Sequence, residues 1–535
     1  LVTGVQTCAL PIFLHHPICK WLLVGAALAG IALTAFTTMA RVPINSDFAN
    51  HVLEGRDWIG GNFFLKDWVL TGISFLTTEL PFYGLSAALL GVQPFAYVLA
   101  EAMILTVFLW FGLLLLRDRV DALTPLDALL YYGIAVVATV EKTGHFRGHT
   151  AAFAAALVIM AIAARILTDG KTSWGWATAL LIVTAIGVTG DFLIVVIAVL
   201  PVVLLCGWEL MNETPRFGRM RCVRVIALTS VGSGAGVGLD RLYFSVGGAV
   251  KNQILSRKNF TALDQIGMNW NRFAQGVVEL MNGTTRQTPI TALSTLRWIA
   301  AAVLIIGMVL VVIETIYAYL KRRHQDLFAV LLALSMAVMA AVCVFTDVLV
   351  TSEFTRYISF LPVFTAILIV RRVNHRNIPQ RRIGGWLSMR VGLALVAALL
   401  IAVNFPPLTF GRPDTRFDRV AAYLVENGYR FGFAHYWNAS SVTVSSHDQV
   451  KIRAITVHRD SDLVPVYAEE QRWFYKPGWF SEAPYTFVLL DDWGYLDVSE
   501  DSIITLFGEP AKVDRFEGYE ILVYKENLVP KLIGR

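Results

Sequence analysis

The 535-residue chain is 56% hydrophobic and only 16% charged, and its mean hydropathy is +0.58. Soluble globular domains carry about 25% charged residues, so this composition excludes an ordinary soluble protein and predicts a polytopic membrane protein. Residues 406–535 hold 19 acidic and 14 basic side chains, which leaves 21 of the 40 acidic and 31 of the 45 basic side chains in residues 1–405. The basic excess therefore belongs to the apolar part, where it indicates membrane topology and not nucleic-acid binding.

The start of the chain is treated separately. Val2 to Ile12 reads as the in-frame translation of a sequencing-library adapter, and we exclude it from reasoning about the fold. Such a start is typical of shotgun-sequenced bacterial DNA, so the expected location is a bacterial inner membrane. We expect residues 1–19 to hold this artefact and a short cytoplasmic start, 20–405 to form a transmembrane domain, and 406–535 to form a soluble extracytoplasmic domain.

Apolar segments long enough to cross a bilayer recur along residues 20–405. A hydrocarbon core about 30 Å thick requires roughly 20 apolar residues per helix. On this template we predict eleven spans, at about 21–40, 94–116, 125–140, 149–167, 174–189, 191–208, 223–240, 297–320, 327–349, 357–373 and 386–404. The expected fold class is an all-α polytopic membrane bundle of about 11 transmembrane helices with a C-terminal extracytoplasmic α/β domain.

The positive-inside rule orients these spans. If Lys20 is cytoplasmic, every basic cluster of the membrane part falls on the cytoplasmic side, from Arg117–Arg119 to residues 371–382. Segment 68–91 is also apolar, but a crossing there would place each of these clusters outside. We therefore predict that 68–91 is an interfacial helix or a shallow re-entrant piece.

The same count places the first loop (41–93), the loop 241–296 and residues 406–535 on the extracytoplasmic side. In loop 241–296, apolar residues recur at helical spacing and predict an amphipathic helix on the outer surface. These residues are Ile266, Trp270, Phe273, Val277 and Leu280.

Residues 406–535 have the pattern of a small α/β domain. Helices are predicted at Phe417–Asn427, ending at Gly428, and at about 501–507. Strands are predicted at Arg430–Trp437, Val450–Val457, Tyr485–Leu490, 511–516 and 519–525, the last two joined by a turn at Glu517-Gly518. The domain contains no nucleotide-binding glycine motif.

The polar segment Asn45 to Asp67 follows the first span directly and is expected to be an external loop resting on the membrane surface. It carries the carboxylates Asp47 and Glu54. Because Asp47 stands just beyond the span, we expect it at the mouth of a membrane-embedded active site. An ordinary solvated carboxylate is the alternative interpretation.

Further ionisable residues lie at predicted membrane edges, where such groups are candidates for function. They are Glu141, His145, Arg147 and His149 in one loop, Asp191 between two spans, and Glu353, Arg356 and Tyr357 before another. His145 and His149 also have a metal-ligand spacing, so a divalent metal stays open, although the sequence indicates no certain cofactor. Asp191 can equally be a turn residue, and Arg356 can simply mark a helix end or pair with Glu353 or Asp347.

Two stretches lie between the first and second predicted spans. The run D-F-A-N-H-V-L-E-G-R-D-W begins at Asp47, and L-L-G-V-Q-P-F-A-Y leads into the second span. Both stretches resemble the GT-C superfamily of membrane glycosyltransferases. Together with Arg356-Tyr357, they are similar to protein O-mannosyltransferases and lipid A aminoarabinose transferase-like proteins. Phe48 stands where those two groups carry a second acidic residue, so the resemblance is to the superfamily and does not indicate a particular sugar.

The resemblance implies an inverting transferase that moves a sugar from a polyprenyl-phosphate donor to a glycan, lipid or protein acceptor on the extracytoplasmic side. Asp47 would be the base, and Arg356 and Arg147 would bind the donor phosphate. The substrate cavity would hold Glu54, Glu141, His145, His149, Asp191, Glu353 and Tyr357. The alternatives are a multi-pass transporter or lipid flippase, and a non-catalytic envelope assembly protein.

Overall fold

The chain folds into two compact units, described here from a computed structural model. The first, here called the helical unit, comprises Leu1–Met39, Ala102–Val237 and Lys258–Leu408; the second, the α/β unit, comprises Ala40–Glu101, Gly238–Arg257 and Thr409–Arg535. The residues described are 17–136, 148–169, 173–249, 260–282, 290–322, 326–347, 355–375, 382–383, 387–404, 411–458, 467–470, 474–491 and 499–532.

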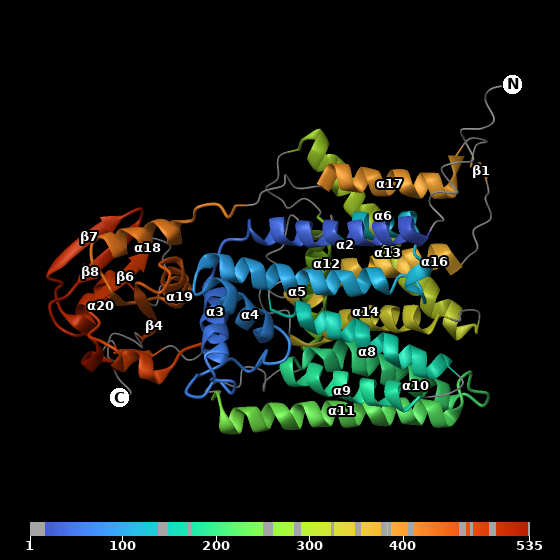
Figure 1. Cartoon of the computed structure of the whole chain (residues 1–535), viewed down its shortest axis with the longest axis horizontal. Helices are drawn as coiled ribbons and strands as arrows, with labels where there is room; N and C mark the ends of the chain where they lie inside the picture. Colours follow the sequence, from blue (N-terminus) through green and yellow to red (C-terminus); the bar gives the residue numbers. More distant parts are fainter. Residues whose placement is uncertain are drawn as a thin grey trace. The chain divides into compact units, whose positions relative to one another are not determined.

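The helical unit is built almost entirely of helices (Figure 1). Its elements are α2 (Pro17–Met39), most of α5 (Pro94–Leu114), η1 (Val120–Ala122), α6 (Pro125–Tyr131), η2 (Tyr132–Val136), α8 (Thr150–Thr168), α9 (Trp174–Gly190), η4 (Val195–Val199), α10 (Leu200–Met211), most of α11 (Arg219–Val246), η6 (Leu263–Gln265), α12 (Ile266–Leu280), α13 (Ala292–Leu320), α14 (Leu327–Phe345), α15 (Thr355–Ile358), α16 (Leu361–His375), β1 (Arg382–Ile383), β2 (Leu387–Ser388) and α17 (Met389–Asn404).

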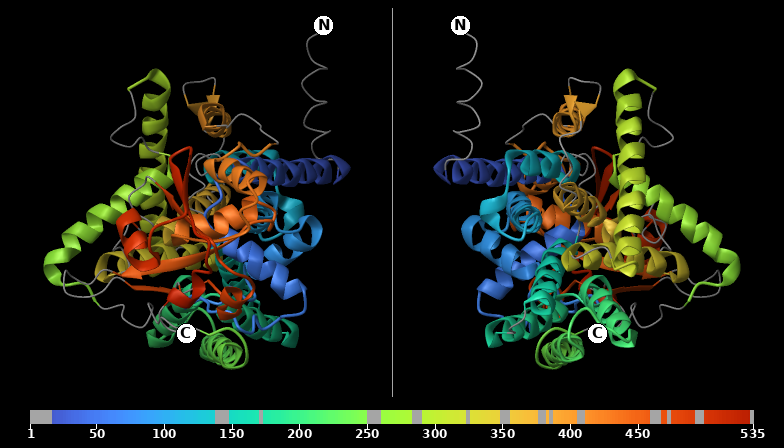
Figure 2. Two further views of the ribbon diagram at one scale, coloured as in Figure 1. Left: turned by 90° about the vertical axis from the view of Figure 1, so that its left-hand side faces the viewer. Right: turned by 90° about the vertical axis from the view of Figure 1, so that its right-hand side faces the viewer.

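Small residues let two of these helices approach closely. A Cβ atom added to Gly236 of α11 would lie 2.7 Å from the carbonyl oxygen of Ala185 in α9, and one added to Gly232 would lie 2.9 Å from that of Leu181. This four-residue spacing of glycines is typical of helix pairs in membranes, where close van der Waals contact replaces the hydrophobic effect. Helices α9 and α11 lie next to each other in Figure 1, and α11 is seen end-on in Figure 2.

Six described helices are long and apolar enough to cross a membrane: Pro94–Leu114, Thr150–Thr168, Arg219–Val246, Ala292–Leu320, Leu327–Phe345 and Thr355–Asn374. Shorter apolar helices occupy Val24–Met39, Leu80–Leu90, Trp174–Gly190, Val195–Met211 and Gly392–Val403. An integral membrane protein with a mostly helical body follows from these helices. The total of eleven spans stays a prediction, since the predicted span 125–140 is described only as far as Val136.

The α/β unit contains a six-stranded sheet in the order β5-β4-β3-β6-β8-β7. Strand β3 is parallel to both β4 and β6, while the other pairs are antiparallel. The strands are β3 (Phe431–Ala434), β4 (Lys451–His458), β5 (Tyr467–Glu470), β6 (Phe487–Asp491), β7 (Lys512–Phe516) and β8 (Tyr519–Val523). The helices are α3 (Ser46–Ile59), α4 (Leu80–Leu90), α18 (Arg416–Glu426), α19 (Tyr436–Ser445), α20 (Glu500–Phe507), η9 (Pro477–Ser481) and η10 (Val529–Lys531).

Apolar clusters cover both faces of this sheet. Phe487 and Leu489 of β6 pack with residues of α18 and α19, whereas Val488 and Leu490 pack on the opposite face with residues of α20. The alternation follows from the period of two in a strand, and it explains why β6 is an unbroken apolar run in the sequence. The result is a three-layer α/β arrangement.

Most predicted elements of residues 406–535 are confirmed, including α18, β4, β6, α20 and the β7–β8 hairpin. The hairpin turn has positive φ at Glu517 (47°) and Gly518 (75°), the conformation that suits a two-residue hairpin loop. The predicted strand Arg430–Trp437 was wrong at its end, because α19 begins at Tyr436. Nearly every residue of α19 is buried, so it lacks the alternation of polar and apolar faces that identifies a helix in a sequence.

The expectation of a loop conformation at Asn45–Asp67 was also wrong, because α3 occupies most of this segment. Asn45 caps this helix by accepting a 3.0 Å hydrogen bond from the Phe48 backbone N–H, an arrangement typical of helix starts. The predicted amphipathic helix at 266–280 is confirmed as α12, whose Phe273, Val277 and Leu280 are buried.

Candidate functional site

Asp47 lies in the first turn of α3, where the helix dipole favours a negative charge. Its Oδ1 accepts a 2.5 Å hydrogen bond from the hydroxyl of Tyr436, the first residue of α19. Burial and the adjacent Asp47 carboxylate raise the pKa of the Tyr436 phenol well above its usual value, so the phenol keeps its proton. The half-buried carboxylate of Asp47 is therefore held by a permanent donor.

Helices α3 and α19 are joined at further points. The Ser46 hydroxyl donates to the backbone carbonyl of Tyr436, and the Ser440 hydroxyl donates to Asn50 Oδ1 over 2.7 Å. Asn50 and Ser440 are 0% and 6% exposed, so these polar groups are removed from water and depend on each other. The contacts fix the orientation of the helix turn that carries Asp47.

One turn beyond Asp47, His51 and Glu54 form a buried pair on α3. His51 Nδ1 lies 2.8 Å from Glu54 Oε2, and the two residues are 7% and 3% exposed. Burial opposes a charge on His51, but the hydrogen bond to Glu54 and the nearby carboxylates outweigh it and raise the pKa of His51. Burial also raises the pKa of Glu54, although His51 acts in the opposite direction.

Aromatic rings and another carboxylate surround this pair. The ring centroids of Phe75, Tyr83 and Phe474 lie 5.4, 5.2 and 5.2 Å from that of His51. The Tyr83 hydroxyl donates a 2.6 Å hydrogen bond to Glu101 Oε1. Aromatic rings and carboxylates thus enclose the pair, and the carboxylates account for the raised pKa of His51.

A second cluster lies within the helical unit and joins residues from three separate segments. His149 Nδ1 is 2.5 Å from Asp191 Oδ2, and the residues are 3% and 1% exposed. Asp191 Oδ1 also accepts from the Leu193 backbone N–H at 2.9 Å, which fixes the carboxylate. The His149 ring lies 4.9 Å from the ring of Tyr357.

Arg356 completes this second cluster. Its guanidinium carbon lies 5.1 Å from the centre of the Tyr357 ring, and Nη2 donates to the Tyr357 hydroxyl at 3.2 Å. The four residues His149, Asp191, Arg356 and Tyr357 were each singled out from the sequence, and the structure brings them together. Such a group can hold an anion against a guanidinium and an imidazole.

Other predicted site residues cannot be placed in this way. Glu141, His145, Arg147 and Glu353 lie outside the described residues.

Within the described ranges, no group of three or more His, Cys, Asp or Glu side chains is arranged to hold a metal ion. Asp47 and Glu54 share one face of α3 at a spacing of seven residues.

Tyr436, Asn50, Ser440 and His51 were not singled out in the sequence. Asn50 and His51 follow Asp47 at the three- and four-residue spacing that puts side chains on one helix face, and this spacing was an available signal once α3 was known to be a helix. No local pattern marks Tyr436, which lies 389 positions from Asp47.

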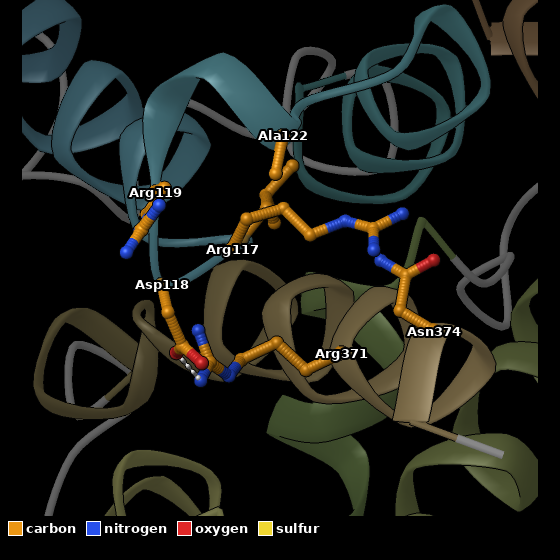
Figure 3. A pocket seen from close by; sticks show the side chains of 7 residues that line it. Arg117, Asp118, Arg119, Ala122, Arg371 and Asn374 are labelled. Carbon is orange, nitrogen blue, oxygen red and sulfur yellow. Dashed lines mark hydrogen bonds and ion pairs between the residues drawn. The ribbon is translucent and has the colours of Figure 1, made fainter. Parts of the chain in front are cut away.

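The helical unit also contains a cavity of about 330 Å³ (Figure 3). It is lined by Leu116, Arg117, Asp118, Arg119, Ala122, Arg371 and Asn374. Arg371 pairs with Asp326 at 2.6 Å and Asp118 at 2.7 Å, while Arg117 pairs with Asp127 at 2.9 Å. Since these two arginines are already paired with carboxylates, we interpret the group as a set of ion pairs that joins helix ends. It also shows that two of the predicted cytoplasmic basic clusters lie at the same end of the unit.

No protein-family profile and no curated protein matches the chain. Among solved structures, it is similar to the archaeal oligosaccharyltransferase AglB from Archaeoglobus fulgidus in complex with an inhibitory peptide and a dolichol-phosphate, with 12% identity over 88% of this chain and 69% of that chain and a TM-score of 0.44. It is also similar to ArnT from Cupriavidus metallidurans in the apo state, with 10% identity over 96% and 99% of the two chains and a TM-score of 0.38.

Proposed function

We propose that the protein is an inverting membrane glycosyltransferase that transfers a sugar from a polyprenyl-phosphate donor to an acceptor hydroxyl on the extracytoplasmic side. The observation that carries the proposal is the fixed carboxylate of Asp47 at the start of α3, held at 2.5 Å by Tyr436. Because Oδ1 accepts from Tyr436, we assign Oδ2 to the acceptor hydroxyl. A positioned carboxylate in this role contributes about 10²–10⁴-fold to the rate.

In the proposed reaction, the acceptor oxygen attacks the anomeric carbon while its proton passes to Asp47. A bond forms between that oxygen and the anomeric carbon, and the bond from the anomeric carbon to the phosphate oxygen breaks. The electron pair of the broken bond leaves with the lipid phosphate. Attack from the face opposite the phosphate inverts the configuration at the anomeric carbon.

The departing phosphate gains charge and requires preorganised donors. We assign Arg356 to it, because a guanidinium can donate two parallel hydrogen bonds to phosphate oxygens. The ring of Tyr357 supports the guanidinium, and Asp191 orients the imidazole of His149 beside that ring. Arg147 is proposed as a second phosphate contact, and Glu54, Glu141, His145 and Glu353 as further residues of the substrate cavity. The proposal places the protein in a bacterial inner membrane, with residues 406–535 outside.

The test is incubation of the purified protein in lipid nanodiscs with labelled polyprenyl-phosphate sugars and a panel of glycan, lipid and peptide acceptors. We expect transfer of label by the wild type and a loss of at least about 100-fold in Asp47→Asn, because the amide cannot take the proton. Asp67→Asn is the matched control, since Asp67 is exposed in the same segment and its φ of 70° suits asparagine. Full transfer by Asp47→Asn would refute the assigned base, and lipid translocation without transfer would indicate a flippase.

A further inference from the structure

We infer that the C-terminal residues 409–535 contribute a positioning residue to the active site, namely Tyr436, whose hydroxyl holds the Asp47 carboxylate in its reactive orientation. The inference rests on the proposed function and deepens it, because it assigns part of the catalytic geometry to the soluble end of the chain. Both residues belong to the α/β unit, so the contact is internal to one compact body.

The hydrogen bond is built for a fixed geometry. Tyr436 is only 6% exposed, and its ring is rigid apart from two torsions. Its hydroxyl lies 2.5 Å from Asp47 Oδ1, within the range of charge-assisted O–H···O⁻ hydrogen bonds. A hydrogen bond to one oxygen restricts the rotation of the carboxylate. This restriction matters because misplacement of a reacting group by about 1 Å can lower the rate roughly 100-fold.

The backbone of Tyr436 is fixed as well. Ser46, the residue before Asp47, donates its hydroxyl to the Tyr436 carbonyl, and the His435 side chain accepts from the Trp437 backbone N–H at 3.5 Å at the start of α19. Tyr436 thus contacts the side chains of two successive residues: its carbonyl accepts from Ser46, and its hydroxyl donates to Asp47.

A second contact one turn further along keeps the two helices in register. Asn50 follows Ser46 by four residues on α3, and Ser440 follows Tyr436 by four residues on α19. Because residues four apart share one helix face, the 2.7 Å hydrogen bond from Ser440 to Asn50 repeats the Ser46–Tyr436 contact one turn away. Two successive contacts define the axial register of α3 on α19, and a slip of either helix would withdraw the Tyr436 hydroxyl.

The chain offers a matched control for this hydrogen bond. The hydroxyl of Tyr429 donates to Asp514 Oδ2, also at 2.5 Å, in the same α/β unit. Tyr429→Phe therefore removes the same kind of bond as Tyr436→Phe without touching α3.

Steady-state transfer from a labelled polyprenyl-phosphate sugar is the first measurement, in nanodiscs with the full chain. We expect Tyr436→Phe to lower kcat by about 10- to 100-fold while KM for the donor changes less than about 2-fold, because Phe keeps the packing and removes only the hydroxyl. Tyr429→Phe should retain wild-type kcat. Equal kcat in the two variants would overturn the inference, as would a loss expressed only in KM.

The second measurement does not require turnover. A carboxyl oxygen adds to the electrophilic carbon of a carbodiimide, and the Tyr436 hydroxyl occupies Oδ1 of Asp47. Peptide mass spectrometry should therefore show faster labelling of Asp47 in Tyr436→Phe than in the wild type or Tyr429→Phe. If the wild type transfers no sugar from any donor, the proposed function fails, and this labelling alone decides the contact; identical labelling in all three proteins refutes it.

Discussion

His149 and Asp191 approach to 2.5 Å in the interior of the helical unit, although 42 positions separate them in the chain. Asp191 occupies the break between α9 and η4, where its other oxygen accepts from the Leu193 backbone N–H. One oxygen of Asp191 is thus held by the backbone of its own turn, and the other orients His149.

If the proposed phosphate site is correct, Asp191 should support donor binding and turnover by orienting His149. Asp191→Asn keeps the size of the side chain but changes the tautomer and orientation it imposes on His149. We expect kcat/KM for the labelled donor to fall at least about 10-fold, in line with losses seen when a partner that orients a histidine is removed. Asp264→Asn, at an exposed position of η6, serves as the control. Unchanged kcat/KM in Asp191→Asn would separate this pair from the phosphate site.

The contact between α3 and α4 predicts a steric effect. A Cβ atom at Gly55 would lie 2.6 Å from the carbonyl carbon of Tyr83, and backbone atoms there cannot move aside easily. Gly55→Ala should therefore lower stability by about 1–3 kcal/mol through overpacking. Gly267→Ala is the matched change, because nothing lies within 4 Å of that site in α12. Thermal unfolding in detergent should show a lower Tm for Gly55→Ala and an equal or higher Tm for Gly267→Ala.

We expect the ion pairs of Arg371 with Asp326 and Asp118 to contribute strongly to stability. It is 5% exposed, and removing its charge leaves the 7%-exposed Asp326 without its main partner. Arg371→Met should cost about 3–5 kcal/mol, the usual cost of breaking a buried ion pair from one side. Arg119→Gln, at an exposed position of the same cavity, should stay within about 0.5 kcal/mol of the wild type. Comparable Tm values for the two variants would contradict a stabilising role of the Arg371 ion pairs.

The His51–Glu54 pair predicts a pH dependence of stability. Both pKa values are raised above the ordinary values of 6.5 and 4.5, so the folded protein binds more protons than the unfolded chain between each ordinary value and the raised one. The contribution of His51 is complete below about pH 6.5 and is lost as pH rises through its folded pKa. Stability should accordingly fall with rising pH in the wild type more steeply than in a His51→Gln/Glu54→Gln double variant.

Thermal unfolding from pH 5 to 9 checks this dependence. The other charged groups near His51 are Asp47 and Glu101, which also favour the imidazolium and reinforce the direction. Parallel Tm profiles for the wild type and the double variant would show that the pair does not titrate differently in the two states.

Much of the fold could be predicted because its signals are local. The amphipathic repeat of α18 ends at a glycine, Gly428, whose φ of 75° suits a helix C-terminus. The Glu517-Gly518 turn has the conformation of its hairpin type, and α12 follows from the spacing of its apolar residues. The helix α3 was missed because nearly all of Ser46–Gly55 is buried, polar residues included, so its sequence lacks the separate polar and apolar faces of a surface helix.

The candidate site was predictable only in part. Asp47, His149, Asp191 and Arg356 are ionisable residues at predicted membrane edges, where such residues are rare, and this made each of them recognisable in the sequence. The residues that hold the helix turn of Asp47 are a tyrosine and two serines, which are common residues without a distinctive spacing. Tyr436 in particular lies in a helix buried on nearly every side, for which the sequence has no periodic signal.

By itself, the sequence determined that the protein is a membrane protein, which segments are apolar helices, and which ionisable residues stand out, because hydropathy and helix or turn preferences act over a few residues. Only the tertiary structure decided that the start of α3 packs on α19 and that the α8, α9 and α15 ends converge on one cluster. Those contacts depend on the complementarity of whole buried surfaces assembled from distant segments, as between Asp47 and Tyr436, and no short-range pattern encodes them.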